Sequence, residues 1–285
     1  MAIELEIKTQ SNYKEKLNLQ EIISENILIG KKDNFDRIII INDFKICEGE
    51  VIFFEEKCMG RGVLINFEEN RIYMRLSVPT VRKEIDLFYN IAYKIEAQLN
   101  TADYSSDAKY NQIEMGYKDN NKALYEAMDL AKNKFKYIEL SCITNPIYIG
   151  EKDVDVINNN IENFEMFLQS RQQNYYYYAI LQLMKKKEVD EVIGFFSLPP
   201  DQWSIIPYRI DTKYNNKIVA PEDIYVFLGQ TKDDIIPYKD LINNLEAKVE
   251  CLYYDYKNVL AKVSSEKAKE LIDKYKVDIE KISKA

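Results

Sequence analysis

Four short runs of apolar and β-branched residues lie between residues 37 and 77, and they constrain the fold more than any other feature. The runs are separated by breaks rich in Asn, Gly and Glu, and they cover Arg37–Asn42, Val51–Glu56, Gly62–Glu68 and Arg71–Ser77. Short β-branched runs between such breaks are typical of an antiparallel meander, in which consecutive strands pair. The alternating stretch Ile3–Lys8 predicts another strand in the same half of the chain.

The hydrophobic period changes after this meander. Between Pro79 and Leu99 the apolar residues recur every three or four positions, as they do on the apolar face of a helix. Proline suits the first turn of such a helix. The same period predicts a helix over Asn121–Lys134 and a further helix that starts near Ser264, which is a suitable N-cap residue.

Residues 100–120 are polar and follow neither period. We therefore expect an α+β fold with an N-terminal unit at residues 1–100, a connection at residues 101–120 and a C-terminal unit at residues 121–285. Each unit would consist of an antiparallel sheet with helices packed on one face.

The order of elements repeats at the ends of the two predicted units. Both "VLINFEENRIYMRLSVPTVRKEIDLFY" and "VECLYYDYKNVLAKVSSEKAKELIDKY" read as a hairpin followed by a helix, and their alignment places Lys83–Ile85 against Lys269–Leu271. Internal duplication of an α+β unit would explain this order. The alternative is that a hairpin followed by a helix is simply a common local arrangement.

Two glycines follow apolar runs and precede acidic residues, in "IYIGEKD" from Ile147 and "VFLGQTKDD" from Val226. A phosphate-binding loop would need several glycines or a Lys-Ser/Thr pair at the start of the helix. Carboxylates at a helix N-terminus instead stabilise the helix dipole and repel phosphate. Both stretches therefore predict the end of a strand and the start of a helix.

The chain contains no histidine, which excludes several common kinds of active site. A Ser-His-Asp triad, a Cys-His pair and a His general base are all impossible. Any catalysis would depend on carboxylates, Lys, Tyr, Cys or a bound cofactor, so a binding protein is favoured over an enzyme. The four cysteines are widely spaced, and this favours free thiols. We expect no catalytic residues, no metal and no cofactor.

The charge balance is acidic, with 47 Asp and Glu against 39 Lys and Arg and a formal net charge of −8. Affinity for nucleic acid rests on clustered Lys and Arg, so we expect no nucleic-acid partner. No apolar run approaches the roughly 20 residues that span a bilayer, and the N-terminus lacks a signal-peptide core. We expect a cytoplasmic protein without a membrane partner, and the oligomeric state stays open.

Arg61 is the best candidate for an anion site. It lies between Gly60 and Gly62 in "MGRG", where glycines allow backbone amides to converge and an Arg side chain can bind a carboxylate or a phosphate. The alternative is a hairpin turn with an exposed Arg.

The strongest candidate for an interaction surface is the tyrosine run Tyr175–Tyr178 together with Trp203, the only tryptophan. On a strand the four tyrosines would alternate between two faces, and Tyr and Trp are enriched in protein interfaces. We therefore predict binding roles for Tyr176 and Trp203, with a strand buried on both sides as the alternative. The runs Tyr175–Met184 and Asp190–Leu198 lie on either side of the charged stretch "KKKEV". They predict a hairpin.

Several stretches together resemble an uncharacterised bacterial family of about 300 residues, found mainly in Firmicutes, that is described as a domain of unknown function. They are the strand "ELEIK", the block "MGRGVLINFEENRIYMRLSVPTVRKEIDLFYNIAYKI", and "PEDIYVFLGQ" with "DLINNLEAK". The resemblance covers most of the chain. It implies a shared cytoplasmic fold and brings no catalytic residues with it.

These observations favour a non-enzymatic binding or protein-interaction protein, with a basic protein as the preferred partner. The alternative is a His-free hydrolase or transferase that uses carboxylates and Arg61. A structural role in a larger assembly is a third hypothesis.

Overall fold

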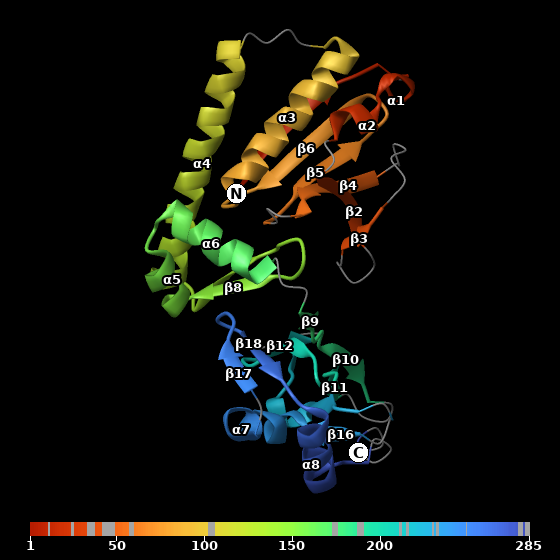
Figure 1. Cartoon of the computed structure of the whole chain (residues 1–285), viewed down its shortest axis with the longest axis vertical. Helices are drawn as coiled ribbons and strands as arrows, with labels where there is room; N and C mark the ends of the chain where they lie inside the picture. Colours follow the sequence, from red (N-terminus) through yellow and green to blue (C-terminus); the bar gives the residue numbers. More distant parts are fainter. Residues whose placement is uncertain are drawn as a thin grey trace. The chain divides into compact units, whose positions relative to one another are not determined.

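The structure is a computed structural model that describes residues 1–10, 12–23, 26–32, 38–41, 49–56, 60–101, 106–172, 176–186, 191–210, 213–214, 217–229, 231, 234–248, 250–278 and 282. The chain divides into two compact units, Met1–Tyr175 and Tyr176–Ala285 (Figure 1). The sequence placed the connection at residues 101–120 instead. Helix α4 (Ser106–Asn133) occupies most of that segment and packs within unit 1.

Unit 1 is built on a six-stranded antiparallel sheet that contains three of the four strands of the predicted meander in consecutive pairing. The first predicted run was wrong in its partner, because Ile38–Ile40 pairs with Ile27–Lys32 and not with the run from Val51. The spatial order is β1 (Ala2–Lys8), β6 (Arg71–Ser77), β5 (Val63–Phe67), β4 (Gly49–Glu55), β2 (Ile27–Lys32) and β3 (Ile38–Ile40). Strand β1 enters beside β6, with Ile3 opposite Leu76. This pairing joins residues 2–8 to residues 71–77 in one sheet.

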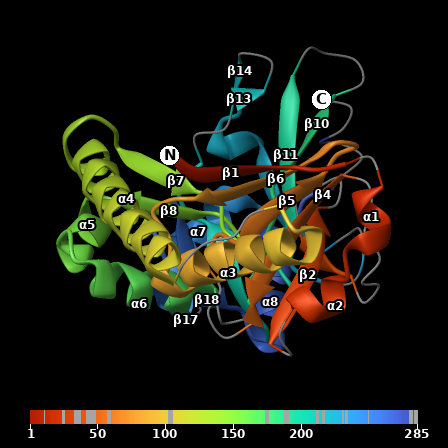
Figure 2. The ribbon, with the colours of Figure 1, turned by 90° about the horizontal axis from the view of Figure 1, so that it is seen from above.

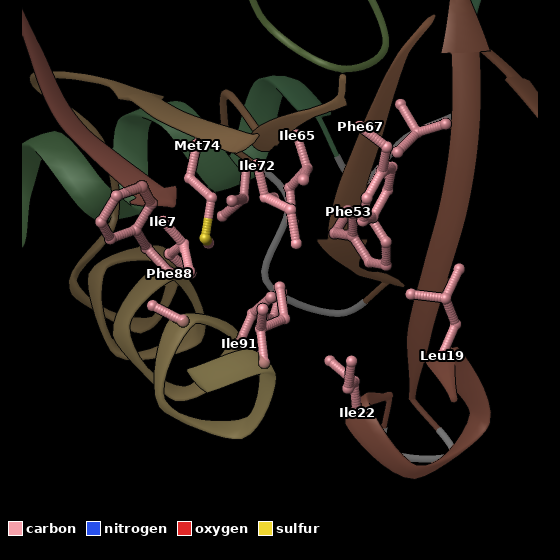
Figure 3. Packing of buried hydrophobic residues seen from close by; sticks show 14 of the residues in the cluster. Ile7, Leu19, Ile22, Phe53, Ile65, Phe67, Ile72, Met74, Phe88 and Ile91 are labelled. Atoms are coloured by element: carbon pink, nitrogen blue, oxygen red, sulfur yellow. The ribbon is translucent and has the colours of Figure 1, made fainter. Parts of the chain in front are cut away.

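Three helices cover one face of this sheet. Helix α3 (Arg82–Leu99) has the predicted period, and it packs with α1 (Tyr13–Lys16) and α2 (Leu19–Ile22) over a buried apolar core. Figure 2 shows α3 along one side of the strands, next to α2. Figure 3 shows Phe88 and Ile91 of α3 directed toward Ile65, Ile72 and Met74 of the sheet.

The rest of unit 1 forms a second core around α4. Hairpin β7 (Tyr137–Leu140) and β8 (Ile147–Gly150) packs with α4, α5 (Glu151–Ile157) and α6 (Ile161–Gln172). The prediction for "IYIGEKD" is confirmed, because β8 ends at Gly150 and α5 begins at Glu151. The Asp153 carboxylate accepts the Gly150 N–H at 2.9 Å, which caps this helix start.

The described residues of unit 2 form two four-stranded sheets and two main helices. One sheet has the order β10 (Gln182–Lys185), β11 (Val192–Ser197), β15 (Ile224–Phe227) and β16 (Ile235–Pro237). The other has the order β17 (Glu250–Tyr253), β18 (Asn258–Lys262), β12 (Trp203–Pro207) and β9 (Tyr177–Tyr178). Helices α7 (Tyr238–Lys248) and α8 (Ser265–Tyr275) pack on a core to which both sheets contribute. The chain between β12 and β15 contains the small hairpin β13 (Lys213–Tyr214) and β14 (Lys217–Ile218) and the 3-10 turn η2 (Pro221–Asp223).

The α+β class is confirmed, with one qualification about the sheets. Strands β11 and β15 are parallel, as are β9 and β12, whereas the other pairs in unit 2 are antiparallel. The predicted hairpin is present only over β10 and β11, because Tyr177–Tyr178 of the first predicted run form β9 in the other sheet. The helix expected directly after "VFLGQTKDD" begins later, because β16 lies between this loop and α7. Asp234 instead accepts the Thr231 N–H at 2.9 Å within the loop.

Both hairpin-plus-helix segments exist, as β5, β6 and α3 and as β17, β18 and α8. The segments belong to sheets with different strand orders. Their aligned glutamates also differ, since Glu84 is buried whereas Glu270 is a surface residue paired with Lys267. A shared order of elements is therefore present, and a duplication is not shown.

Among the described residues, no helix combines the length and the apolar character needed to cross a bilayer.

Candidate functional site

The three residues singled out from the sequence lie in two places. Tyr176 and Trp203 belong to one apolar cluster of unit 2, whereas Arg61 lies in the turn between β4 and β5 of unit 1.

The cluster in unit 2 occupies the face of the β17-β18-β12-β9 sheet that is turned away from the main core. We define this aromatic face by Tyr176, Tyr178, Trp203, Ile205, Leu252, Tyr254 and Leu260. Residues on alternate positions of the same strands, such as Ile206 and Ala261, belong to the main core instead. The strands thus carry apolar side chains on both sides, as the tyrosine run predicts, because Tyr177 packs against the main core while Tyr176 and Tyr178 do not.

The edge of the aromatic face is exposed and carries charge. Leu252 lies opposite Leu260 on the edge strand β17 and is 57% exposed. Lys262 lies opposite Trp203, so these two side chains share one side of the sheet. An exposed apolar residue beside partly buried aromatic rings and a charged border is the composition of an interface.

The turn in unit 1 contains the backbone convergence that the glycines of "MGRG" predicted, but an internal group occupies it. The Glu84 carboxylate accepts the N–H groups of Gly60 at 3.0 Å, Arg61 at 2.9 Å and Gly62 at 2.8 Å. The hydroxyl of Thr80 donates to the same carboxylate. Glu84 lies in the first turn of α3 and is 1% exposed.

Both glycines of this turn are required by its geometry. A Cβ on Gly60 would lie 2.7 Å from Glu84 Oε2, and Gly62 has a φ of +72°. Glycine adopts this left-handed conformation without the steric cost that other residues meet. Three successive N–H groups in such a turn form a concave site for an anion.

The Arg61 side chain turns away from this carboxylate site and holds backbone carbonyl groups. Its Nε donates to Ser141 O at 3.1 Å and its Nη1 donates to Val78 O at 3.3 Å. The Gly60 carbonyl also accepts the Ile143 N–H at 3.1 Å. The turn thereby joins the six-stranded sheet to the segment after β7, and Arg61 has a positioning role there.

Burial dominates the electrostatics of this site. It raises the pKa of Glu84 against the opposing effect of the hydrogen bonds from Thr80 and the three amides. It lowers the pKa of Arg61, against the attraction of Cys142 and Glu84. It also raises the pKa of the Cys142 thiol to about 12, so this free thiol is a poor nucleophile near neutral pH. Two other cysteines, Cys47 and Cys58, lie outside the described residues.

Sequence reasoning did not select Glu84, although a signal was present. Glu84 precedes Phe88 by four positions, so it falls on the apolar stripe of α3 rather than on the polar side. A carboxylate on the apolar stripe of a helix indicates an internal anion that is held by buried donors. Asn120 of α4 was also missed, and its buried side chain binds the backbone N–H and carbonyl of Thr80 at 2.8 and 2.9 Å.

A family model described as a domain of unknown function (DUF4299) matches residues 2–284. The chain belongs to the DUF4299 family. The resemblance to a family described as a domain of unknown function is confirmed, whereas its bacterial origin stays a prediction. The match extends over both units. No curated protein and no solved structure matches the chain.

Within the part of this DUF4299 chain that the structure describes, no group of three or more Cys, Asp or Glu side chains is arranged to hold a metal ion. The two candidate places therefore differ in kind. The turn at Arg61 is closed by internal hydrogen bonds, whereas the aromatic face is an apolar cluster of unit 2 in which Leu252 is exposed and Ile205, Tyr254 and Leu260 are buried.

Proposed function

We propose that this chain is a binding protein that recognises another protein through the aromatic face of unit 2. The observation that supports the proposal is the gathering of Tyr176, Tyr178 and Trp203 beside the exposed Leu252. Large aromatic side chains that are partly buried around an exposed aliphatic residue resemble the anchors of protein interfaces.

A basic partner fits the acidic balance of the chain, whose formal net charge is −8. Opposite net charges accelerate association and make it sensitive to salt. We therefore propose a partner with an apolar patch surrounded by Lys or Arg. Its complex should weaken when the ionic strength rises.

The alternative of a His-free enzyme gains no support from the turn at Arg61. The guanidinium group donates to two backbone carbonyls, and the Glu84 carboxylate faces four donors. A catalytic role would require these groups to leave their partners, so we favour the binding protein.

Site-specific crosslinking in cells tests the proposal. A photoreactive phenylalanine analogue replaces Leu252, and a matched control carries it at Met184, which is 49% exposed on the other sheet of unit 2. We expect discrete adducts with a basic protein from position 252 and none of these adducts from position 184. The Trp203→Ser substitution should reduce the adduct from position 252 by more than about tenfold if Trp203 is an anchor.

Two results would contradict the proposal. One is the absence of adducts from position 252 under conditions in which a known interface crosslinks. The other is an identical set of adducts from positions 252 and 184, which would indicate random collisions. Mass spectrometry of the adducts separates these outcomes.

A further inference from the structure

The hydrogen-bond donors around the turn Gly60–Gly62 match the acceptor pattern of a carboxylate. An ionised carboxylate accepts about four hydrogen bonds, and Glu84 faces three backbone amides and one hydroxyl. Oε1 accepts from Gly60 and Gly62, and Oε2 accepts from Arg61 and Thr80. The donors are thus shared equally between the two oxygens.

The donors are held in place independently of Glu84. Asn120 fixes the backbone of Thr80 through two hydrogen bonds, and the Arg61 side chain anchors the turn to Ser141 and Val78. The Gly60 carbonyl is bound by the Ile143 amide. Donors held by their own partners form a preorganised site, which does not have to be assembled by its ligand.

We propose that Gly60–Gly62 and Thr80 form a carboxylate-binding site in which the Glu84 carboxylate is a replaceable ligand. When Glu84 lacks its carboxylate, the site takes up a small free carboxylate of the size of formate or acetate. Occupation of the site joins the turn between β4 and β5 to Thr80, which lies just before α3. This inference is independent of the proposed function, because its residues lie in unit 1 and the aromatic face lies in unit 2.

The size of the ligand follows from the substitution Glu84→Ala. The atoms that Ala lacks relative to Glu are those of an acetate ion, so acetate restores the missing atoms. Propionate is larger than the space and must displace buried neighbours such as Thr80, which is fully buried. Acetamide has the shape of acetate but presents an N–H₂ group to donors, so it leaves at least one amide without an acceptor.

Thermal unfolding of Glu84→Ala in the full chain tests the proposal, with wild type as the control. Acetate at about ten times its dissociation constant should raise the midpoint of unit 1 by roughly 3–5 °C, whereas equal concentrations of chloride or acetamide should not. Formate should act like acetate, and propionate should act less. Wild type should show only the small general salt effect, because Glu84 already fills the site.

Hydrogen exchange provides the second measurement. In Glu84→Ala the amides of Gly60–Gly62 and of Ile143 should exchange faster than in wild type, and acetate should restore their protection. If Glu84→Ala is unfolded without ligand, the same titration should recover the near-UV circular dichroism of the folded chain. The proposal is overturned if acetate acts no more strongly than chloride, or if acetate stabilises wild type and Glu84→Ala equally.

Discussion

At the scale of single residues, the ionisation of Glu84 connects pH to the stability of unit 1. Burial raises the pKa of this carboxyl above its ordinary value of 4.5, so the folded chain binds the proton more tightly than the unfolded chain does. A raised pKa contributes stability that is fully present below the unfolded pKa and is lost as the pH rises through the folded pKa.

We expect the wild type to lose stability relative to Glu84→Gln as the pH rises above about 4.5. The amide of Gln does not titrate, so the difference between the two proteins isolates Glu84 from the other carboxylates. Urea unfolding of both proteins at several pH values measures this difference. A difference in unfolding free energy that stays constant with pH would show that Glu84 does not couple folding to protonation.

At the scale of elements, the turn between β4 and β5 depends on Gly62 for two separate reasons. Its φ is +72°, and a Cβ at this position would lie 2.5 Å from Ile52 Cγ2. We expect Gly62→Ala to destabilise the chain through backbone strain and through a clash with a buried side chain.

Gly49, at the start of β4, provides the matched control. Its φ is +99°, but a Cβ there would meet no atom within 4 Å. Gly49→Ala should therefore cost about 1–3 kcal/mol from backbone strain alone, and Gly62→Ala about 1–3 kcal/mol more from overpacking. Chemical denaturation measures both values. Equal losses would mean that Ile52 moves aside without cost.

Elements with strong local signals could be predicted, and those that depend on tertiary contacts could not. Ser264 caps α8 by accepting the Lys267 N–H at 3.2 Å, as its position before the apolar period suggested. The first half of α4 was missed because its sequence is polar and contains Gly116. A Cβ on Gly116 would lie 2.8 Å from Tyr89 and 2.9 Å from Ile85, so this glycine permits close packing of α4 on α3.

The candidate sites show the same division. The alternation of Tyr176 and Tyr178 with Tyr177 follows from strand geometry, and it predicted which rings share a face. The meeting of Tyr176 with Trp203 depends on the parallel pairing of β9 with β12, and no local pattern indicates such a pairing. The glycines around Arg61 predicted a site for an anion, but a long-range contact decides that Glu84 fills it.

At the scale of the whole molecule, each unit has its own buried core. Phe53, Ile65 and Phe88 belong to the core of unit 1, and Ile206, Val226 and Leu241 belong to the core of unit 2. A unit with its own core can unfold as a separate cooperative block. The only tryptophan, Trp203, lies in unit 2, so its fluorescence reports the unfolding of that unit, whereas far-UV circular dichroism reports both.

Because Trp203 reports the unfolding of unit 2 alone, substitutions in the two units should shift different unfolding transitions. Glu84→Ala leaves three amides of unit 1 without their acceptor, which should cost about 2–4 kcal/mol. It should lower the circular dichroism transition of unit 1 and leave the tryptophan transition unchanged. Ile206→Ala opens a cavity in the core of unit 2, where Ile206 is fully buried, and should lower the tryptophan transition by a similar amount. A tryptophan transition that follows Glu84→Ala as closely as it follows Ile206→Ala would mean that the two units unfold as one.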